Sequence, residues 1–119
     1  MHVLVVDDDE LIRDTLATAL SDEGYTVRVA SDGRAALSTL GEWRPDLIVL
    51  DLMMPIMDGQ AFRAAQRTAR GVEDIPVIVL SAAHNVQARA ADLEAAAIFP
   101  KPFDLSALLD AVERALQTR

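Results

Sequence analysis

The sequence contains no cysteine, and this absence excludes several kinds of site at once. Disulfides, thiolate nucleophiles and cysteine-ligated zinc all require cysteine, so carboxylates remain the plentiful reactive groups. Apolar runs of membrane-spanning length are absent too, and no basic, apolar leader precedes the first expected strand. We therefore expect a cytoplasmic protein that is neither exported nor inserted into a membrane.

Basic residues are in short supply: 11 of them face 19 acidic residues, which gives a net charge of −8. Such a chain repels a phosphate backbone unless its cations cluster, and no cluster occurs, so we expect no direct binding to nucleic acid. The length of 119 residues and the apolar fraction of 51% are those of one compact domain. We expect that domain to cover residues 1–119.

Apolar runs of strand length alternate five times with segments of helical periodicity. This alternation predicts an α/β fold in which helices cover both faces of a doubly wound, five-stranded parallel sheet. The expected strands cover residues 2–6, 25–30, 46–50, 75–80 and 97–99. The helical patterns cover residues 12–20, 36–40, 61–69, about 85–94 and 105–116, and the third of them places Ala61, Phe62, Ala65 and Ala69 on one side of the helix. Gly24 is expected as a left-handed cap after the first helix, and Gly71 as the end of the third.

Polar residues follow four of the five expected strands directly. Asp7 and Asp8 follow the first strand, Asp51 the third, Ser81 the fourth and Lys101 the fifth. In open parallel sheets the ligand site forms outside the carboxyl ends of the strands, where strand order reverses. We therefore expect these side chains to meet at one corner of the molecule.

Each of these residues also has an ordinary structural explanation. Asp9 suits a helix N-cap, Asp7 or Asp8 a turn, Ser81 the start of a helix and Lys101 a solvated loop. Taken singly, those explanations are favoured, because polar residues are common in loops. Their coincidence at four strand ends favours a functional site.

Crowded carboxylates determine the chemistry that we expect at this corner. Like charges within a few ångströms repel one another and raise their pKa values, so the acids need a counter-ion. Mg²⁺ takes hard oxygen ligands and commonly binds carboxylates together with phosphate oxygens, whereas Ca²⁺ favours more ligands. With the metal and Lys101 balancing the charge, a carboxylate can attack a phosphoryl group and form an aspartyl-phosphate.

Four strings at the ends of expected strands carry a resemblance to a known family. They are Val5-Val6-Asp7-Asp8-Asp9, Leu50-Asp51-Leu52-Met53-Met54-Pro55 with Met57-Asp58-Gly59, Leu80-Ser81-Ala82 and Lys101-Pro102-Phe103. In these strings, and over its entire length, the chain resembles the receiver domains of two-component response regulators. The resemblance implies a (βα)5 fold with the flavodoxin-like strand order 2-1-3-4-5.

The resemblance also implies roles for individual residues. Asp51 corresponds to the phosphoacceptor and Asp8 to the main metal carboxylate, while Asp7 assists through water and the Met53 carbonyl is a further ligand. The implied cation is Mg²⁺, with Mn²⁺ as an alternative. Ser81 would contact the phosphoryl group, as would Lys101, whose peptide bond to Pro102 is expected to be cis.

A receiver implies partners and a conformational signal. The implied donor is the phosphohistidine of a sensor histidine kinase or phosphotransfer protein, and the domain promotes its own phosphorylation and dephosphorylation. Phosphorylation would shift the population of two conformers and alter a surface that includes Val86, Ala90, Ala97 and the last helix. That surface would act on a downstream protein or a fused output domain, from a monomer or a weak, phosphorylation-dependent dimer.

Three positions depart from the usual receiver pattern. Receivers place an aromatic switch residue three positions before the lysine, where this chain has Ile98; the neighbouring Phe99 points to the opposite face of the strand and does not replace it. Glu94 stands where glycine commonly follows the fourth helix, which predicts a different, mobile helix end. Ser81 replaces the more frequent threonine and keeps its hydroxyl.

Two residues outside the strings have both structural and functional interpretations. His84 lies close to the hydroxyl loop, and we favour a solvated loop side chain over a role in access. Trp43 is interpreted as a partly buried cover at a helix end rather than as an interaction residue.

Other classes of function remain open at this point. A haloacid-dehalogenase-type phosphatase would use two of the aspartates after the first strand, but Leu11 occupies the place of its small hydroxyl residue or valine. A flavodoxin-like cofactor site would need a glycine- or hydroxyl-rich loop after that strand. A binding module that has lost phosphotransfer is opposed by the complete set of acids, hydroxyl and lysine, but Ile98 keeps it open.

Overall fold

The computed structural model describes residues 1–54, 57–69, 71–81 and 94–117. Its five strands are all parallel and form one sheet in the order β2-β1-β3-β4-β5, which confirms the expected flavodoxin-like topology. The strands are β1 (His2–Val6), β2 (Thr26–Ala30), β3 (Leu47–Asp51), β4 (Val77–Ser81) and β5 (Ala97–Pro100).

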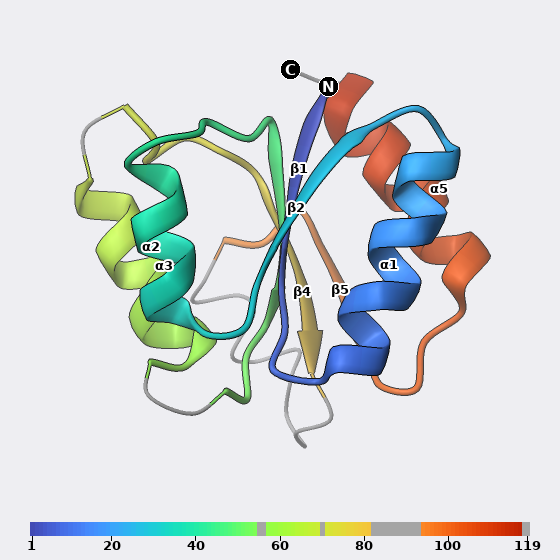
Figure 1. Ribbon diagram of the computed structural model, residues 1–119, viewed down its shortest axis with the longest axis horizontal. Coiled ribbons are helices and arrows are strands. Elements are labelled where there is room, and N and C mark those ends of the chain that lie inside the picture. The colour runs from blue at the N-terminus through green and yellow to red at the C-terminus, as the bar shows by residue number, and fades with distance from the viewer. Residues whose placement is uncertain (55–56, 70, 82–93, 118–119) are drawn as a thin grey trace.

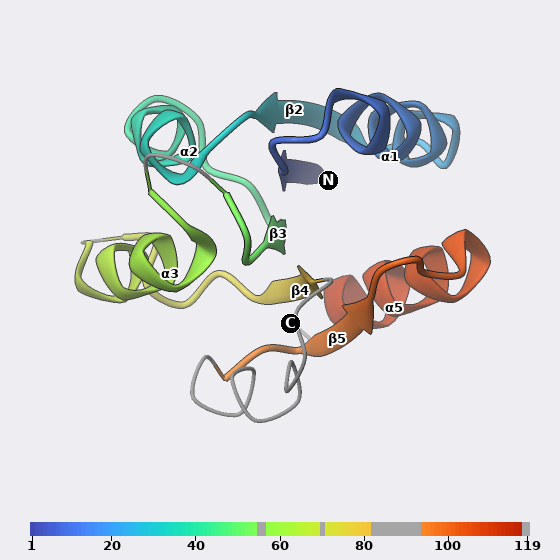
Figure 2. The same cartoon turned by 90° about the horizontal axis from the view of Figure 1, so that it is seen from below.

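Helices cover both faces of this sheet, as Figures 1 and 2 show. The helices of the described ranges are α1 (Glu10–Asp22), α2 (Gly33–Leu40), α3 (Gly59–Thr68) and α5 (Leu105–Gln117). The first and last of them lie together on one face, and α2 and α3 lie on the other. The helix expected over residues 85–94 falls almost entirely outside the described ranges. No helix within those ranges is long and apolar enough to cross a membrane.

The sheet is buried because its central strands are apolar on both faces. Side chains alternate along each strand, so Val3 and Val5 pack with α1 and α5, while Leu4 and Val6 pack with α2 and α3. The edge strand β2 is mostly exposed, in agreement with its predicted place at the border of the sheet. This two-sided burial holds the carboxyl ends of β1, β3 and β4 in fixed register.

The strand boundaries differ slightly from those expected. Strand β3 begins one residue later than predicted; the Asp46 side chain accepts from the His2 N–H at 2.8 Å, and the Asp46 N–H donates to the His2 carbonyl at 2.7 Å. Strand β4 begins at Val77 and includes Ser81. Consequently Asp51 and Ser81 are the last residues of their strands rather than the first residues after them.

The helix ends confirm one glycine prediction and correct another. Gly24 follows the C-cap of α1 with φ of +95°, as expected of a left-handed cap. Helix α3 ends earlier than predicted, at Thr68 with Ala69 as its C-cap, so Gly71 lies beyond the helix end with φ of +89°.

Helix α3 buries a polar pair that its apolar pattern does not predict. Ala61, which we expected on the apolar face, is exposed, whereas Arg63 and Gln66 are buried beside Phe62. Arg63 Nη1 donates to Gln66 Oε1 at 2.7 Å and to the Ile75 carbonyl at 3.3 Å. We call Arg63 and Gln66 the guanidinium–amide cluster.

Gln66 completes this cluster by donating through Nε2 to the carbonyl oxygens of Val72 (2.8 Å) and Ile75 (3.2 Å). Burial lowers the pKa of the Arg63 guanidinium, and the charge of Arg67 adds to the effect. The cluster thereby supports the turn that connects α3 to β4.

Trp43 lies at the amino-terminal end of the strands. It is half-buried against the core on the α2–α3 side of the sheet. Its ring stacks on His2, with centroids 4.8 Å apart and planes at 9°, and the Arg28 guanidinium lies 5.0 Å from the ring centroid. This packing supports the interpretation of Trp43 as a structural cover.

Candidate functional site

Four of the predicted site residues lie at the carboxyl ends of neighbouring strands. Asp7 and Asp8 follow β1, Asp51 ends β3 and Lys101 follows β5. One carboxylate oxygen from each of Asp7, Asp8 and Asp51 lies within 4.8 Å of the other two. We call these three residues the acidic cluster.

Asp7 is completely buried, and each of its polar groups has a partner. Its N–H donates to the Ala30 carbonyl at 3.1 Å, and its carbonyl accepts from Arg13 Nη1 at 3.0 Å. Its side chain accepts from the Asp9 N–H at 2.9 Å through Oδ1 and from Lys101 Nζ at 2.8 Å through Oδ2. Asp7 is therefore fixed in place by β2, α1 and the residue that follows β5.

Asp51 is buried as well, with 2% of its surface exposed. Its Oδ1 accepts from the Met53 N–H at 3.2 Å, and its Oδ2 lies 3.4 Å from Lys101 Nζ. Burial and the nearby charge of Asp7 raise the pKa of Asp51 to about 6, although Lys101 opposes the shift. Burial alone would lower the pKa of Lys101, but its hydrogen bond to Asp7 and the charge of Asp51 outweigh burial and raise it.

The acidic cluster suits a hard divalent cation. It presents three carboxylates but only one ammonium in contact with them, so negative charge is in excess. Asp8 is exposed, and in the part of the chain that the structure describes no side chain forms an ion pair with it. Carboxylate oxygens grouped in this way are donors that Mg²⁺ and Mn²⁺ accept. Burial is the main cause of the raised pKa of Asp51 and the charge of Asp7 adds to it, so a cation beside these acids would favour the ionised carboxylate.

Ser81 and Met53 flank the acidic cluster. Ser81 is buried at the end of β4, which pairs with β3, and its carbonyl accepts from the Lys101 N–H at 3.0 Å. Met53 has an exposed side chain and is held by its N–H to Asp51. The expected hydroxyl contact of Ser81 and metal contact of the Met53 carbonyl remain predictions.

The backbone around Asp51 requires glycine at the start of α3. A Cβ atom on Gly59 would lie 2.6 Å from the Asp51 carbonyl oxygen and 2.7 Å from Leu52 Cα, both of them backbone atoms. Glycine at position 59 therefore lets α3 approach the strand end that carries Asp51. Asp58 caps that helix by accepting from the Ala61 N–H at 2.9 Å.

The structure tests several smaller predictions from the sequence. Asp9 is confirmed as the N-cap of α1, and the peptide bond between Lys101 and Pro102 is cis, as expected. Ile98 packs on the α2–α3 side of the sheet and Phe99 on the α1–α5 side, which confirms that Phe99 does not occupy the place of Ile98.

Glu94 adopts a left-handed conformation (φ +53°) at the position where the family commonly has glycine. It also forms an exposed ion pair with Arg67 at 3.1 Å. The remaining residues with predictions in this region, namely His84, Val86 and Ala90, lie outside the described residues.

Sequence reasoning missed Arg13. Its side chain reaches from α1 to the Asp7 carbonyl, next to the acidic cluster. The only available signal was its position six residues after Asp7, one turn into a helix whose cap is Asp9. Residue spacing alone does not distinguish this contact from a solvated arginine.

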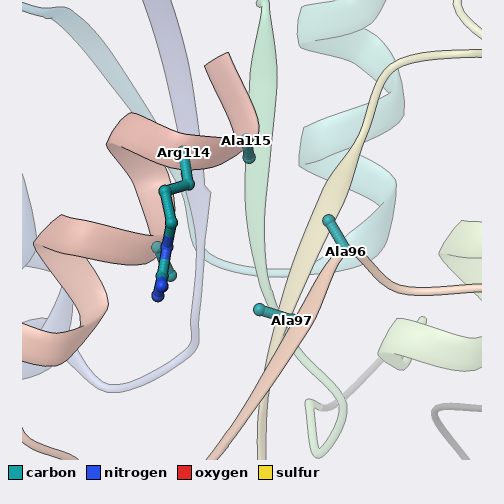
Figure 3. A pocket seen from close by; sticks show the side chains of 5 residues that line it. Ala96, Ala97, Arg114 and Ala115 are labelled. Atoms are coloured by element: carbon teal, nitrogen blue, oxygen red, sulfur yellow. The ribbon is translucent and has the colours of Figure 1, made fainter. Parts of the chain in front are cut away.

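A hollow of about 300 Å³ lies apart from the acidic cluster, between the start of β5 and α5 (Figure 3). Its described lining consists of Ala96, Ala97, Ala111, Arg114 and Ala115. One cation among four alanines provides neither a nucleophile nor a set of metal ligands. The described lining of this hollow therefore offers none of the reactive groups found at the acidic cluster.

Comparisons with known proteins agree with this geometry. Residues 3–113 match the response regulator receiver domain family. The chain is 45% identical to response regulator MprA of Mycolicibacterium vanbaalenii over 112 residues, which are 92% of this chain and 47% of that protein. It is 42% identical to MprA of Mycobacterium leprae over 120 residues, covering 98% of this chain and 51% of that one. The chain thus spans about half the length of these curated relatives.

Solved structures show the same fold. The receiver domain of the Francisella response regulator 1452 superposes with a TM-score of 0.89 at 30% identity, covering 98% of this chain and 97% of the other. The chemotaxis response regulator CheY4 of Vibrio cholerae gives a TM-score of 0.87 at 33% identity, covering 96% and 97%.

Proposed function

This chain belongs to the family of response regulator receiver domains, and we propose that it signals by accepting a phosphoryl group on Asp51 in a reaction that depends on a divalent cation. The observation that carries the proposal is a buried carboxylate at a strand end, held between a second buried acid and a lysine. We also propose that residues 1–119 act as one receiver domain in the cytoplasm.

In the proposed reaction, a carboxylate oxygen of Asp51 attacks the phosphorus of a phosphohistidine in line with the bond that breaks. The new O–P bond forms as the N–P bond breaks, and the imidazole nitrogen of the donor keeps the electron pair. Lys101 and the Ser81 hydroxyl would hold the oxygens of the transferred group. Phosphoryl transfer requires mainly positioning and charge stabilisation, which rigid strand ends supply.

Asp8 and Asp51 would hold the cation directly, with the Met53 carbonyl as a further ligand and Asp7 acting through water. Mg²⁺ held by these residues, or Mn²⁺ in its place, would supply positive charge beside the phosphoryl oxygens. Asp7 is suited to the indirect role because each of its own oxygens already accepts a hydrogen bond from the protein.

The raised pKa of Asp51 sets the pH range of the proposed reaction. The nucleophile must be ionised, and with a pKa of about 6 roughly nine-tenths of Asp51 is ionised at pH 7. We expect phosphorylation to fall as the pH drops through this range. Saturating Mg²⁺ should move the midpoint to lower pH, because a bound cation favours the carboxylate.

The proposed donor is a sensor histidine kinase or a phosphotransfer protein, and small phosphodonors should serve because the domain supplies the acceptor chemistry itself. Phosphorylation would then shift a conformational equilibrium, with Ser81 and Ile98 at the switch positions. The curated relatives are about twice as long as this chain. We therefore propose that the signal passes to a downstream protein or an attached output domain, from a monomer or a weak, phosphorylation-dependent dimer.

Intact mass spectrometry after incubation with acetyl phosphate tests this proposal. We expect one added phosphoryl group on the wild type with Mg²⁺, and none with EDTA or on Asp51→Asn. Asp74→Asn is the matched control, because Asp74 is an exposed acid outside the acidic cluster. An adduct that survives Asp51→Asn, or a folded wild type that takes up no phosphoryl group with Mg²⁺, would contradict phosphotransfer at Asp51.

A further inference from the structure

The Asp8 carboxylate has no ion pair or side-chain hydrogen bond of its own among the described residues, so its direction depends on the backbone around it. Two hydrogen bonds fix that backbone. Arg13 Nη1 donates to the Asp7 carbonyl at 3.0 Å, which fixes the peptide before Asp8. The Asp9 N–H donates to Asp7 Oδ1 at 2.9 Å, which fixes the peptide after it.

We propose that Arg13 is a positioning residue for the divalent cation, acting through the peptide that joins Asp7 to Asp8. This inference rests on the function proposed above. The Asp7 carbonyl lies beyond the last residue of β1, where the pairing of β1 with β2 and β3 has ended. The Arg13 guanidinium therefore gives the Asp7 carbonyl the hydrogen bond that a neighbouring strand gives to the carbonyls within β1.

Arg13 is well placed to hold this peptide rigidly. It lies in the first turns of α1, where its own N–H donates to the Asp9 carbonyl at 3.0 Å. The Asp9 side chain caps the same helix by accepting from the N–H groups of Leu11 and Ile12. The start of α1 and the peptides on both sides of Asp8 thus form one hydrogen-bonded unit, and the arginine side chain closes it.

Charge and positioning predict opposite effects of removing Arg13. A cation beside the site repels Mg²⁺, so charge alone predicts tighter Mg²⁺ binding when the arginine becomes neutral. Positioning predicts weaker binding, because the Asp8 carboxylate is then held less rigidly among the three acids. The sign of the change in affinity therefore separates the two explanations.

Isothermal titration of MgCl₂ into the full chain measures that sign. We expect Arg13→Met to weaken Mg²⁺ binding by about tenfold, as is typical for residues that orient metal ligands, and Arg13→Lys to weaken it by about threefold. Arg44→Met is the matched control, because it removes the same charge from an exposed ion pair with Asp74 outside the acidic cluster. Its affinity should stay within about twofold of wild type, the range that long-range charge effects at an exposed site allow.

A second readout separates positioning from general damage to the fold. In acetyl phosphate assays, the Mg²⁺ concentration for half-maximal phosphorylation should rise with Arg13→Met, while the rate at saturating Mg²⁺ stays close to wild type. Circular dichroism checks that each variant is folded. If Arg13→Met does not fold, Arg13→Lys decides the question, because it keeps the charge and alters the contact.

Equal or tighter Mg²⁺ binding in the folded Arg13→Met protein, or affinity equal to wild type in Arg13→Lys when that variant decides, would overturn the positioning role. Absence of Mg²⁺ binding by the wild type would instead overturn the function proposed for the acidic cluster. The two failures are thereby distinguished.

Discussion

The acidic cluster, in which Asp7 and Asp51 are buried and Asp8 is exposed, and the buried guanidinium–amide cluster are both polar, yet their polar groups are satisfied in different ways. In the guanidinium–amide cluster, Gln66 accepts a hydrogen bond from the Arg63 guanidinium and donates to backbone carbonyl oxygens. The hydrogen-bond partners of this cluster are therefore all supplied by the fold. In the acidic cluster, Asp7 and Asp51 share Lys101, and Asp8 adds further negative charge. The guanidinium–amide cluster thus needs no ligand, whereas the acidic cluster has an excess of negative charge that a bound cation can neutralise.

This difference separates structural from functional burial of charge. A buried polar group that the fold satisfies stabilises one conformation, while crowded like charges destabilise the fold until a ligand joins them. On this basis, substitutions in the acidic cluster should change the stabilisation that Mg²⁺ gives, whereas variants in the guanidinium–amide cluster should gain as much stability from Mg²⁺ as wild type does.

The largest effect is expected from Lys101→Met. This substitution leaves the fully buried Asp7 without its ion-pair partner, which should lower the free energy of unfolding by about 3–5 kcal/mol in EDTA. Mg²⁺ should restore part of the loss and bind more tightly than in wild type, because a competing cation has gone. Urea unfolding followed by circular dichroism, with and without Mg²⁺, measures both effects. A loss that Mg²⁺ leaves unchanged would break the comparison.

Gln66→Ala should have the next largest effect, a loss of about 2–4 kcal/mol in the free energy of unfolding. The substitution leaves a cavity and removes the donor to the buried carbonyls of Val72 and Ile75. The same urea experiment should show no dependence on Mg²⁺ beyond that of wild type. Gln117→Ala is the control, because Gln117 is exposed on a helix, and it should change stability by less than about 0.5 kcal/mol.

Asp51→Asn should stabilise the protein at pH 8 in EDTA by on the order of 1–2 kcal/mol. The folded-state pKa of Asp51, about 6, lies above its ordinary value, so the folded protein holds this proton more tightly than the unfolded chain does. Wild-type stability should therefore fall as the pH rises from about 4 to 6, and the gain from asparagine should vanish below pH 4. Thermal unfolding at several pH values measures this gain. The exposed Asp74→Asn should show no such window, and a variant less stable than wild type at pH 8 would reverse the sign.

The smallest effect concerns the cation itself. At a Mg²⁺ concentration tenfold above its Kd, wild type should gain about 1.4 kcal/mol of stability by mass action. That gain should shrink below pH 6, where Asp51 takes up a proton, and in Asp51→Asn at every pH. Calorimetry with and without Mg²⁺ checks both trends. An equal gain in Asp51→Asn would show that the cation binds without this carboxylate.

The sequence predicts the sheet and the acidic cluster well because both depend on a local pattern. Continuous apolar runs ending in Asp7, Asp51 and Ser81 indicate parallel strands, and parallel strands place their ends together. The pattern does not define strand boundaries to the residue: β3 begins at Leu47 although Asp46 is hydrogen-bonded to His2 through both its backbone and its side chain.

The sequence does not reveal hydrogen bonds between a side chain and the backbone of a residue several positions away in the chain. The helical pattern gave no prediction for Arg63 or Gln66, and only their hydrogen bonds to the carbonyls of the following turn show why both are buried. The same pattern placed Ala61 on one side of the helix with Phe62, although Ala61 is exposed. The contact of Arg13 with Asp7 could not be predicted for a related reason, because its acceptor is a main-chain carbonyl that any residue could provide.

The position of Trp43 determines what can be seen by fluorescence. It is the sole tryptophan of the chain, and its ring partner His2 stands at the opposite end of β1 from Asp7, roughly 16 Å of strand away at about 3.3 Å per residue. Its emission should therefore follow unfolding, and the separation of His2 from the ring, much more strongly than any change at the acidic cluster. Tryptophan fluorescence should therefore report unfolding of the protein and not phosphorylation of Asp51. A fluorescence assay of phosphorylation would require a second fluorophore placed near the acidic cluster.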